Sequence, residues 1–277
     1  MRVLIIGGSG FIGYHTHNYL SKFKKFDLKT TYHISKKKNF IKYELGNPLP
    51  LSILKFKPQI IINTAWYGIP NFSFNYSYLN LINNIKFLKE LDKLKSLKKI
   101  IVLGSCWELL DNESISEDIQ YFIWAKKSIN TYYNIFTKLN KISYNWVRIF
   151  YVYGSGQKKS SLIPSLVEKL KKNKKVKLNN PNATQDFVYI KDVTSVIKLL
   201  ISNKDTFELN VGSGKLVKIK YIKDTIDSLI SKKSINYKPE IKNTDNILIE
   251  EDMKILKQFF SFKPSYHIED GLKDLLK

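Results

Sequence analysis

The stretch Gly7-Gly8-Ser9-Gly10-Phe11-Ile12-Gly13 decides the fold. It follows the apolar run Arg2–Ile6, which predicts a buried strand, and it opens a segment with helical spacing. Glycines at 7, 10 and 13 permit a tight turn, a close approach of backbone to a pyrophosphate, and close helix–strand packing. Backbone N–H groups at a helix start attract anions. The stretch therefore predicts a dinucleotide cradle, to which we also assign Phe11 and Ile12.

Beyond this turn, short β-branched runs alternate with segments of helical spacing. The predicted strands are Arg2–Ile6, Leu28–His33, Gln59–Thr64, Lys99–Leu103 and Tyr144–Ile149. This alternation predicts an α/β fold with a Rossmann-like, doubly wound parallel sheet. After Gly154 the regularity weakens. We therefore place a dinucleotide-binding domain at residues 1–155 and a smaller substrate-binding lobe mostly at 156–277, with some segments returning to the first domain.

The composition narrows the class of protein. The 277 residues are 43% hydrophobic, which favours a globular fold, and the formal net charge is +22. Arg2 and Arg148 are the only arginines, and the lysines are spread along the whole chain. Because nucleic-acid binders usually use arginine for bidentate contacts, we expect no nucleic-acid partner, although acidic ligands should be attracted to the surface.

Other classes of site are excluded by simple counts. A single cysteine, Cys106, rules out an internal disulfide and a cysteine-built zinc site. Of the four histidines, only His15 and His17 have a metal-like spacing, and on a helix their side chains would diverge by about 200°. We expect no metal. No stretch approaches 18 uninterrupted apolar residues, and the N-terminus has no small-residue cleavage site. These features predict a cytoplasmic protein without a membrane partner.

The second predicted strand bears on the choice of cofactor. An acid at its end would bond a ribose 2′-hydroxyl and repel a 2′-phosphate, but the sequence from 31 to 38 contains no acid. His33, Ser35 and Lys36 are suited to contact a 2′-phosphate instead. The sequence therefore favours NADP(H), with NAD(H) as the alternative.

The chain resembles the extended short-chain dehydrogenase/reductase family, in its nucleotide-sugar epimerase, dehydratase and reductase branch. Gly7–Gly13 matches the family's GxxGxxG. The other similar segments are Asn63–Ala65, Asn80–Leu88, Val102–Glu108, Arg148–Gln157, Gln185–Val193 and Leu209–Gly212. The resemblance implies a nucleotide-diphosphate sugar as substrate and runs nearly end to end.

The same resemblance implies roles for particular residues. It implies cofactor contacts at Ala65 and Asn80. The substrate contacts that it implies are Ser105, Cys106, Trp107, Tyr151, Gln157 and Gln185. Tyr151 stands where many members have Asn, and Gln185 stands where Arg is common, so the nucleotide or the sugar can differ from those of other members.

The resemblance further implies a catalytic Ser, Tyr and Lys in the order Ser … Tyr-x-x-x-Lys. Ser105 takes the first role and Lys126 the last, where the lysine also holds the nicotinamide ribose. The residue four before Lys126 is Phe122, whereas Tyr121 lies five before it, about 140° around a regular helix. Either an irregular helix start brings Tyr121 to the site, or Phe122 fills the tyrosine position, or the protein binds nucleotides without redox chemistry.

Two acidic residues have predicted supporting roles. Glu108 follows Ser105 closely enough to line the pocket. Asp192 precedes a helical pattern, which favours an N-cap role.

We interpret the chain as an NADP(H)-dependent reductase of a nucleotide-linked 4-keto deoxy sugar for surface polysaccharide. The short loop between Ser105 and the following helix is similar to that of compact reductases. The alternatives are a nucleotide-sugar 4-epimerase or dehydratase using bound NAD(H), and a non-catalytic nucleotide-sugar-binding protein. Relatives commonly dimerise through two helices, so we expect a homodimer in which one of these helices includes residues 121–139.

Overall fold

The computed structural model describes residues 1–110, 115–232 and 253–277. In these residues the strands are β1 (Arg2–Ile6), β2 (Asp27–Tyr32), β3 (Ile41–Lys42), β4 (Ile60–Asn63), β5 (Lys99–Ser105), β6 (Ser143–Ile149), β7 (Tyr151–Tyr153), β8 (Thr184–Tyr189), β9 (Phe207–Val211) and β10 (Leu216–Lys218). The helices are α1 (Phe11–Leu20), α2 (Leu51–Phe56), α3 (Phe74–Leu91), α4 (Glu117–Leu139), α5 (Leu162–Lys171), α6 (Ile190–Ser202), α7 (Ile219–Ser231), α9 (Lys254–Phe260) and α10 (Ile268–Leu276), with a 3₁₀ turn η1 (Cys106–Leu109).

The chain divides into two compact units. The first contains Met1–Arg148 and Thr194–Leu209, and the second contains Ile149–Val193 and Asn210–Lys277. The first continuous part of the first unit ends at Arg148, a few residues before the boundary proposed at 155, and Thr194–Leu209 is the later segment that also belongs to this unit.

The main sheet has seven strands in the order β3-β2-β1-β4-β5-β6-β9. Its central pairs are parallel, with Val3 of β1 opposite Leu28 of β2 on one side and Ile60 of β4 on the other. The central strands are buried on both faces, which explains their unbroken apolar runs. The predicted Rossmann-like parallel sheet is confirmed.

The strand order reverses between β1 and β4. From β1 the chain proceeds outward to β2 and β3, then returns to place β4 on the other side of β1. In open α/β sheets, ligands bind outside the carboxyl ends of the strands at such a reversal. The ends of β1 and β4, at Ile6 and Asn63, therefore mark the expected position of the site.

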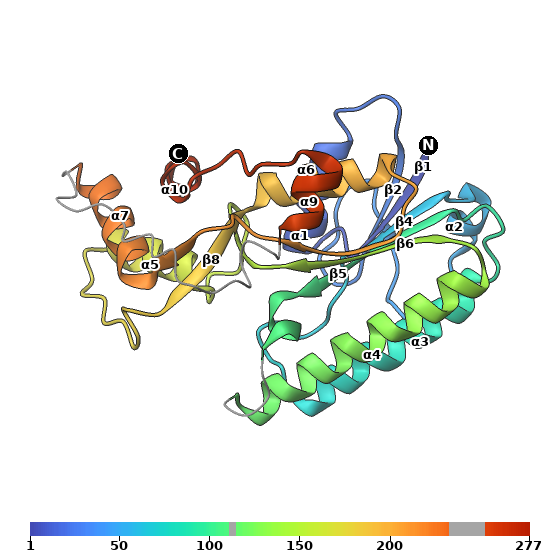
Figure 1. Ribbon diagram of the computed structural model, residues 1–277, viewed down its shortest axis with the longest axis horizontal. Helices are drawn as coiled ribbons and strands as arrows, with labels where there is room; N and C mark the ends of the chain where they lie inside the picture. The colour runs from blue at the N-terminus through green and yellow to red at the C-terminus, as the bar shows by residue number, and fades with distance from the viewer. Residues whose placement is uncertain (111–114, 233–252) are drawn as a thin grey trace. The chain divides into compact units, whose positions relative to one another are not determined.

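Helices cover both faces of the main sheet. Figure 1 shows α3 and α4 running side by side along one face and α1 on the other. The long helices bury apolar side chains against the sheet, including Phe87 and Leu88 of α3 and Ile129 of α4. This core fixes the positions from which α4 presents its polar residues.

The five predicted strands are all present, with ends that differ by at most two residues. Strands β3 and β9 of the main sheet were not predicted. Strand β3 is only two residues long, too short to show a period, and β9 joins the sheet after a long excursion through the second unit.

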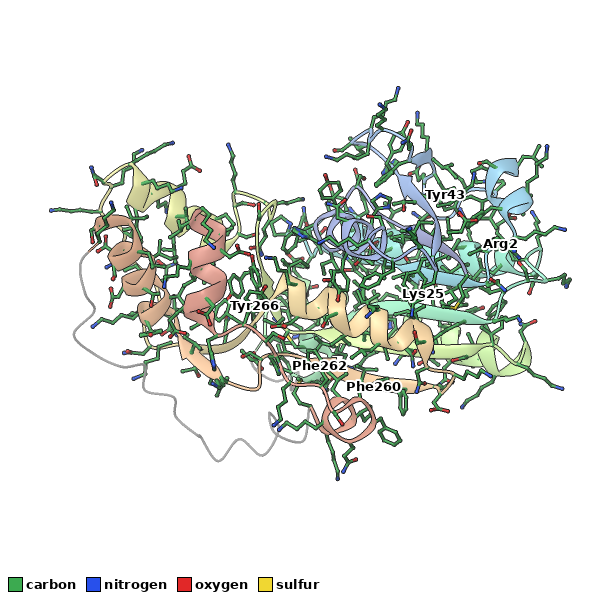
Figure 2. All side chains as sticks on the ribbon, turned by 90° about the horizontal axis from the view of Figure 1, so that it is seen from above. Arg2, Lys25, Tyr43, Phe260, Phe262 and Tyr266 are labelled. Carbon is green, nitrogen blue, oxygen red and sulfur yellow. The ribbon has the colours of Figure 1, made fainter. Side chains whose placement is uncertain are left out.

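The second unit has its own three-stranded sheet, in the order β10-β8-β7. Strand β8 pairs antiparallel with β10 and parallel with β7. Helices α5, α7 and α10 belong to this unit. Tyr266 of the C-terminal segment, labelled in Figure 2, packs against Tyr189 at the end of β8, with 4.7 Å between ring centroids.

Among the described residues, no helix is long and apolar enough to cross a membrane. In the same residues, no three His, Cys, Asp or Glu side chains gather in a way that could hold a metal ion.

Candidate active site

The turn between β1 and α1 depends on glycine at two positions. Gly7 has φ +78°, and a Cβ there would lie 2.8 Å from Ala65 Cα. A Cβ on Gly13 would lie 2.4 Å from the Gly7 carbonyl oxygen. The Gly10 N–H donates to that same oxygen at 3.0 Å. The absence of side chains thus lets the turn pack directly against the residues that follow β4.

Helix α1 begins at this turn without a side-chain cap. Gly10 is the N-cap residue, no side chain accepts from the first N–H groups, and the first turn contains no acid. The first helical residues are Phe11 and Ile12. Such a helix start offers N–H donors and the positive end of the helix dipole to an anion. The residues present therefore fit the pyrophosphate of a dinucleotide.

A buried polar network shapes the turn after β4. Asn63 Oδ1 accepts from the Ala65 N–H at 3.1 Å. Asn63 Nδ2 donates to Asn84 Oδ1 and to the Tyr133 hydroxyl, both at 3.0 Å. The network holds Ala65, a predicted cofactor contact, beside Gly7 at the strand-order reversal.

Asn80 supports a loop. Its Oδ1 accepts from the Tyr67 N–H at 2.8 Å, and its Nδ2 donates to the carbonyl oxygens of Tyr67 and Tyr76 at 2.8 and 2.7 Å. Both amide hydrogens are thereby used within the chain. Asn80 therefore holds this loop in place, and its contact with the cofactor stays a prediction.

The residues predicted to select the cofactor are exposed at the end of β2. His33, Ser35 and Lys36 all lie on the surface. An acid that the local sequence did not indicate lies beside one of them, because His33 Nε2 is 3.6 Å from Glu44 Oε1. Glu44 follows the unpredicted strand β3. Glu44 lies next to β2 because β3 pairs with β2, and a strand of only two residues has no pattern from which this pairing could be predicted.

Ser105 ends β5 and begins η1. Its Oγ accepts from the Trp107 N–H at 3.3 Å, while Glu108 Oε1 accepts from the Ser105 N–H at 2.7 Å. These reciprocal bonds form a capping box. They fix Ser105 at the carboxyl end of a central strand and leave its hydroxyl hydrogen available to donate.

Helix α4 is regular from Glu117, so the irregular start required by the Tyr121 interpretation is not present. Phe122 and Lys126 are both buried, as the i, i+4 spacing on one face requires. Tyr121 instead donates a short hydrogen bond to Glu117 and packs against Phe74. That bond raises the pKa of Tyr121, which disfavours the phenolate. Tyr121 thus lies outside the cluster around Lys126.

The Lys126 side chain is enclosed by aromatic rings. Its Nζ donates to the Leu103 carbonyl oxygen at 2.8 Å and lies 4.1 Å from the Trp66 ring centroid. Burial lowers the pKa of Lys126 to about 8, an effect that the nearby Glu108 carboxylate opposes. The ammonium is therefore charged at neutral pH and close to titration.

Three aromatic side chains surround Phe122. Its ring centroid lies 5.0 Å from those of Trp66 and Phe72, and 5.7 Å from that of Trp107. This cluster brings Trp107, a predicted substrate contact, next to the position where the family's tyrosine is expected. Cys106, the residue before it, is half-buried on η1.

Three predicted substrate contacts lie in the second unit. Tyr151 pairs with Phe187 across β7 and β8, and their ring centroids are 5.8 Å apart. Gln185 is two residues before Phe187, so it shares that face of the small sheet. Gln157 Nε2 donates to the carbonyl oxygen of Val152, in β7, at 3.0 Å. Tyr151 and Gln185 are thus brought onto one surface.

Asp192 does not cap α6, because the helix begins at Ile190. Its carboxylate instead accepts from the N–H groups of Ser265 and Tyr266, at 2.9 and 3.2 Å. The predicted N-cap is wrong, since a partner 73 residues away could not be inferred from local sequence.

The sequence profile of the NAD dependent epimerase/dehydratase family matches residues 3–212. The chain belongs to this family. CDP-abequose synthase of Salmonella typhimurium is 25% identical over 99% of this chain and 97% of its own length. dTDP-4-dehydro-6-deoxyglucose reductase of Escherichia coli is 25% identical over 72% of this chain and 66% of its own.

Solved structures support the same fold. Bordetella bronchiseptica WbmF in complex with NAD+ and UDP superposes with a TM-score of 0.80 at 17% identity, over 99% of this chain and 91% of that one. The family match and the curated relatives identify the chain as a member of a family of NAD(P)-dependent enzymes that modify nucleotide sugars.

Proposed function

We propose that the protein reduces the 4-keto group of a nucleotide-linked deoxy sugar with NADP(H), as a step toward surface polysaccharide. The observation that carries this proposal is the buried Lys126 ammonium. It lies on the α4 helix face that meets the end of β5, where Ser105 begins η1. The similarity to a CDP-abequose synthase and a deoxyglucose reductase supports reduction of a deoxy sugar.

The residues have distinct roles in this proposal. The nicotinamide cofactor, when bound, supplies a hydride to the keto carbon. Ser105 donates its hydroxyl hydrogen to the keto oxygen, which gains negative charge as the hydride arrives. Lys126 stabilises that charge and provides the proton, because its pKa of about 8 leaves it protonated at neutral pH. Tyr151, Gln157 and Gln185 bind the nucleotide sugar.

The proposed preference for NADP(H) rests on the charges at the end of β2. His33, Ser35 and Lys36 offer donors to a 2′-phosphate, whereas Glu44 opposes it. The dissociation constants for NADPH and NADH, measured by titration, show whether the three donors outweigh the Glu44 carboxylate. Tighter binding of NADPH supports the proposal, and removal of the opposing charge in Glu44→Gln should increase that preference. Equal or reversed affinity in the wild type contradicts it.

A second candidate is a nucleotide-sugar-binding protein that catalyses no redox step. It is favoured by Phe122, which cannot exchange a proton and which packs tightly among three other aromatic rings. An epimerase or dehydratase would return its hydride and consume no net NADPH. Measurement of product and NADPH together separates the three functions, since a reductase uses one NADPH for each product.

We also propose that the protein is a cytoplasmic homodimer that assembles through α3 and α4. Large apolar side chains are exposed on these two helices, namely Phe74, Tyr78, Trp124, Tyr132, Ile135 and Leu139. Phe74 and Trp124 border an open groove of about 580 Å³. A second copy of the same helix pair would cover this apolar surface.

A further inference from the structure

Glu108 is a buried carboxylate held by three donors. Its Oε1 accepts from the Ser105 N–H at 2.7 Å, and its Oε2 accepts from Trp146 Nε1 at 2.8 Å and Arg148 Nε at 3.2 Å. The residue is only 3% exposed. Burying a charge costs free energy unless it is paired and hydrogen-bonded, so this geometry constitutes a dedicated carboxylate site.

The residue before Ser105 makes room for this carboxylate. A Cβ on Gly104 would lie 2.5 Å from Trp146 Nε1 and 2.7 Å from Glu108 Oε1. Any side chain there would therefore displace the carboxylate from the end of β5. Glycine at 104 and glutamate at 108 are thus structurally coupled.

Glu108 acts on both candidate catalytic residues. Through the capping box it fixes the Ser105 backbone, from which the hydroxyl projects. It also attracts the Lys126 ammonium and so opposes the effect of burial on the pKa of that lysine. The other charged groups of this network are Arg148, on β6, and Glu208, on β9, which bonds Arg148 Nη2 at 2.7 Å.

We propose that Glu108 is a positioning residue of the active site, whose buried carboxylate orients Ser105 and balances the ammonium of Lys126. The proposal rests on the reductase function. The substrate oxygen would then contact the Ser105 hydroxyl in a fixed position and the Lys126 ammonium, whose charge Glu108 helps to maintain. Misplacement of a reacting group by about 1 Å can cost on the order of 10²-fold in rate.

Glu108→Gln tests the proposal directly. The amide NH₂ must face either the Ser105 N–H or the Trp146 and Arg148 donors, so one set of bonds is lost. We expect kcat to fall by about 10- to 100-fold with a much smaller change in KM. We also expect the alkaline loss of activity to move to lower pH, because Lys126 loses its nearby anion.

Glu208→Gln is the matched control. Glu208 also bonds Arg148, but it is largely exposed and makes no bond to Ser105. We expect its kcat and pH profile to remain within about 2-fold of the wild type. If Glu108→Gln matches the wild type, or if both variants lose the same activity, the positioning role is refuted.

Two further measurements keep the test decisive. Glu108→Asp retains the negative charge but has a shorter side chain, which should no longer hold Ser105 in place. We therefore expect kcat to fall, while the pH at which activity is lost stays closer to that of the wild type. NADPH titration against pH needs no turnover, and Glu108→Gln should lose affinity at lower pH than the wild type. A wild type that binds NADPH but reduces no nucleotide 4-keto sugar refutes the proposed reaction; unchanged binding in Glu108→Gln refutes the role of Glu108.

Discussion

At the scale of single residues, the central feature is that α4 has a phenylalanine, Phe122, where the family's tyrosine is expected, and its tyrosine, Tyr121, one residue earlier. Phe122 is buried four residues before Lys126, and Tyr121 is turned away toward Glu117. The proposed catalytic residues Ser105 and Lys126 follow the family's order, but the position four residues before Lys126 has no phenol. Proton transfer by a positioned side chain contributes about 10²–10⁴-fold to a rate, so this substitution should matter.

Phe122→Tyr should therefore increase turnover. The hydroxyl would be added on the face that carries Lys126, and we expect kcat to rise by about 10-fold or more. Steady-state kinetics with the same substrate and NADPH would measure the gain. Tyr121→Phe is the control and should leave kcat within about 2-fold, because its phenol bonds only Glu117 among the contacts of the described residues. A large loss in Tyr121→Phe would restore that residue as the proton donor.

The pKa of Lys126 predicts how kcat/KM depends on pH. Burial lowers its pKa to about 8, so the ammonium is present below that pH and is lost above it. We expect kcat/KM to decrease as the pH rises through about 8, whereas an ordinary lysine, with a pKa of about 10.5, would remain charged. A profile recorded between neutral and alkaline pH checks this. Activity that stays level far above pH 8 would exclude Lys126 as the proton source.

At the scale of elements, the β1–α1 turn is the proposed site of cofactor binding and the α3–α4 pair is the proposed dimer interface. The turn exposes N–H groups to an anion because its glycines leave no side chains in the way. The helix pair buries one face against the sheet and leaves apolar side chains on the other. Both features follow from local sequence, which is why the glycine turn could be predicted before the structure.

Gly13→Ala should weaken cofactor binding. Its Cβ would meet the Gly7 carbonyl oxygen at 2.4 Å, so the turn must move. We expect the dissociation constant for NADPH to rise by about 10-fold or more, measured by fluorescence titration. Asn18→Ala, an exposed substitution on the same helix, is the control and should bind as the wild type does. Normal affinity in Gly13→Ala would contradict the cradle.

Trp124→Glu should dissociate the dimer. The substitution places a charge on an exposed apolar surface of α4, where a partner copy would have to desolvate it. Light scattering coupled to gel filtration would measure the mass. A dimeric Trp124→Glu protein, or a monomeric wild type at the same concentration, would rule out this interface.

At the scale of the whole molecule, the sequence predicted the fold well and the site in part. The parallel sheet and the glycine turn carry local patterns, and both are present. Asn80, Asp192 and Glu44 could not be placed from local sequence. Their contacts depend on a loop, a C-terminal segment and a two-residue strand that lack a periodic signal. Side chains that end in nitrogen project from both units in Figure 2, and the net charge of +22 is in keeping with a general attraction for acidic ligands.

The most direct test of the account is the ratio of NADPH oxidised to sugar product formed. Purified protein would be mixed with NADPH and nucleotide-linked 4-keto-6-deoxy sugars carrying different bases. We predict one NADPH oxidised for each keto group reduced, and no such consumption in Lys126→Met. Product formed without net oxidation of NADPH, or no chemistry on any of these sugars despite bound cofactor, would contradict reduction at the site of Ser105 and Lys126.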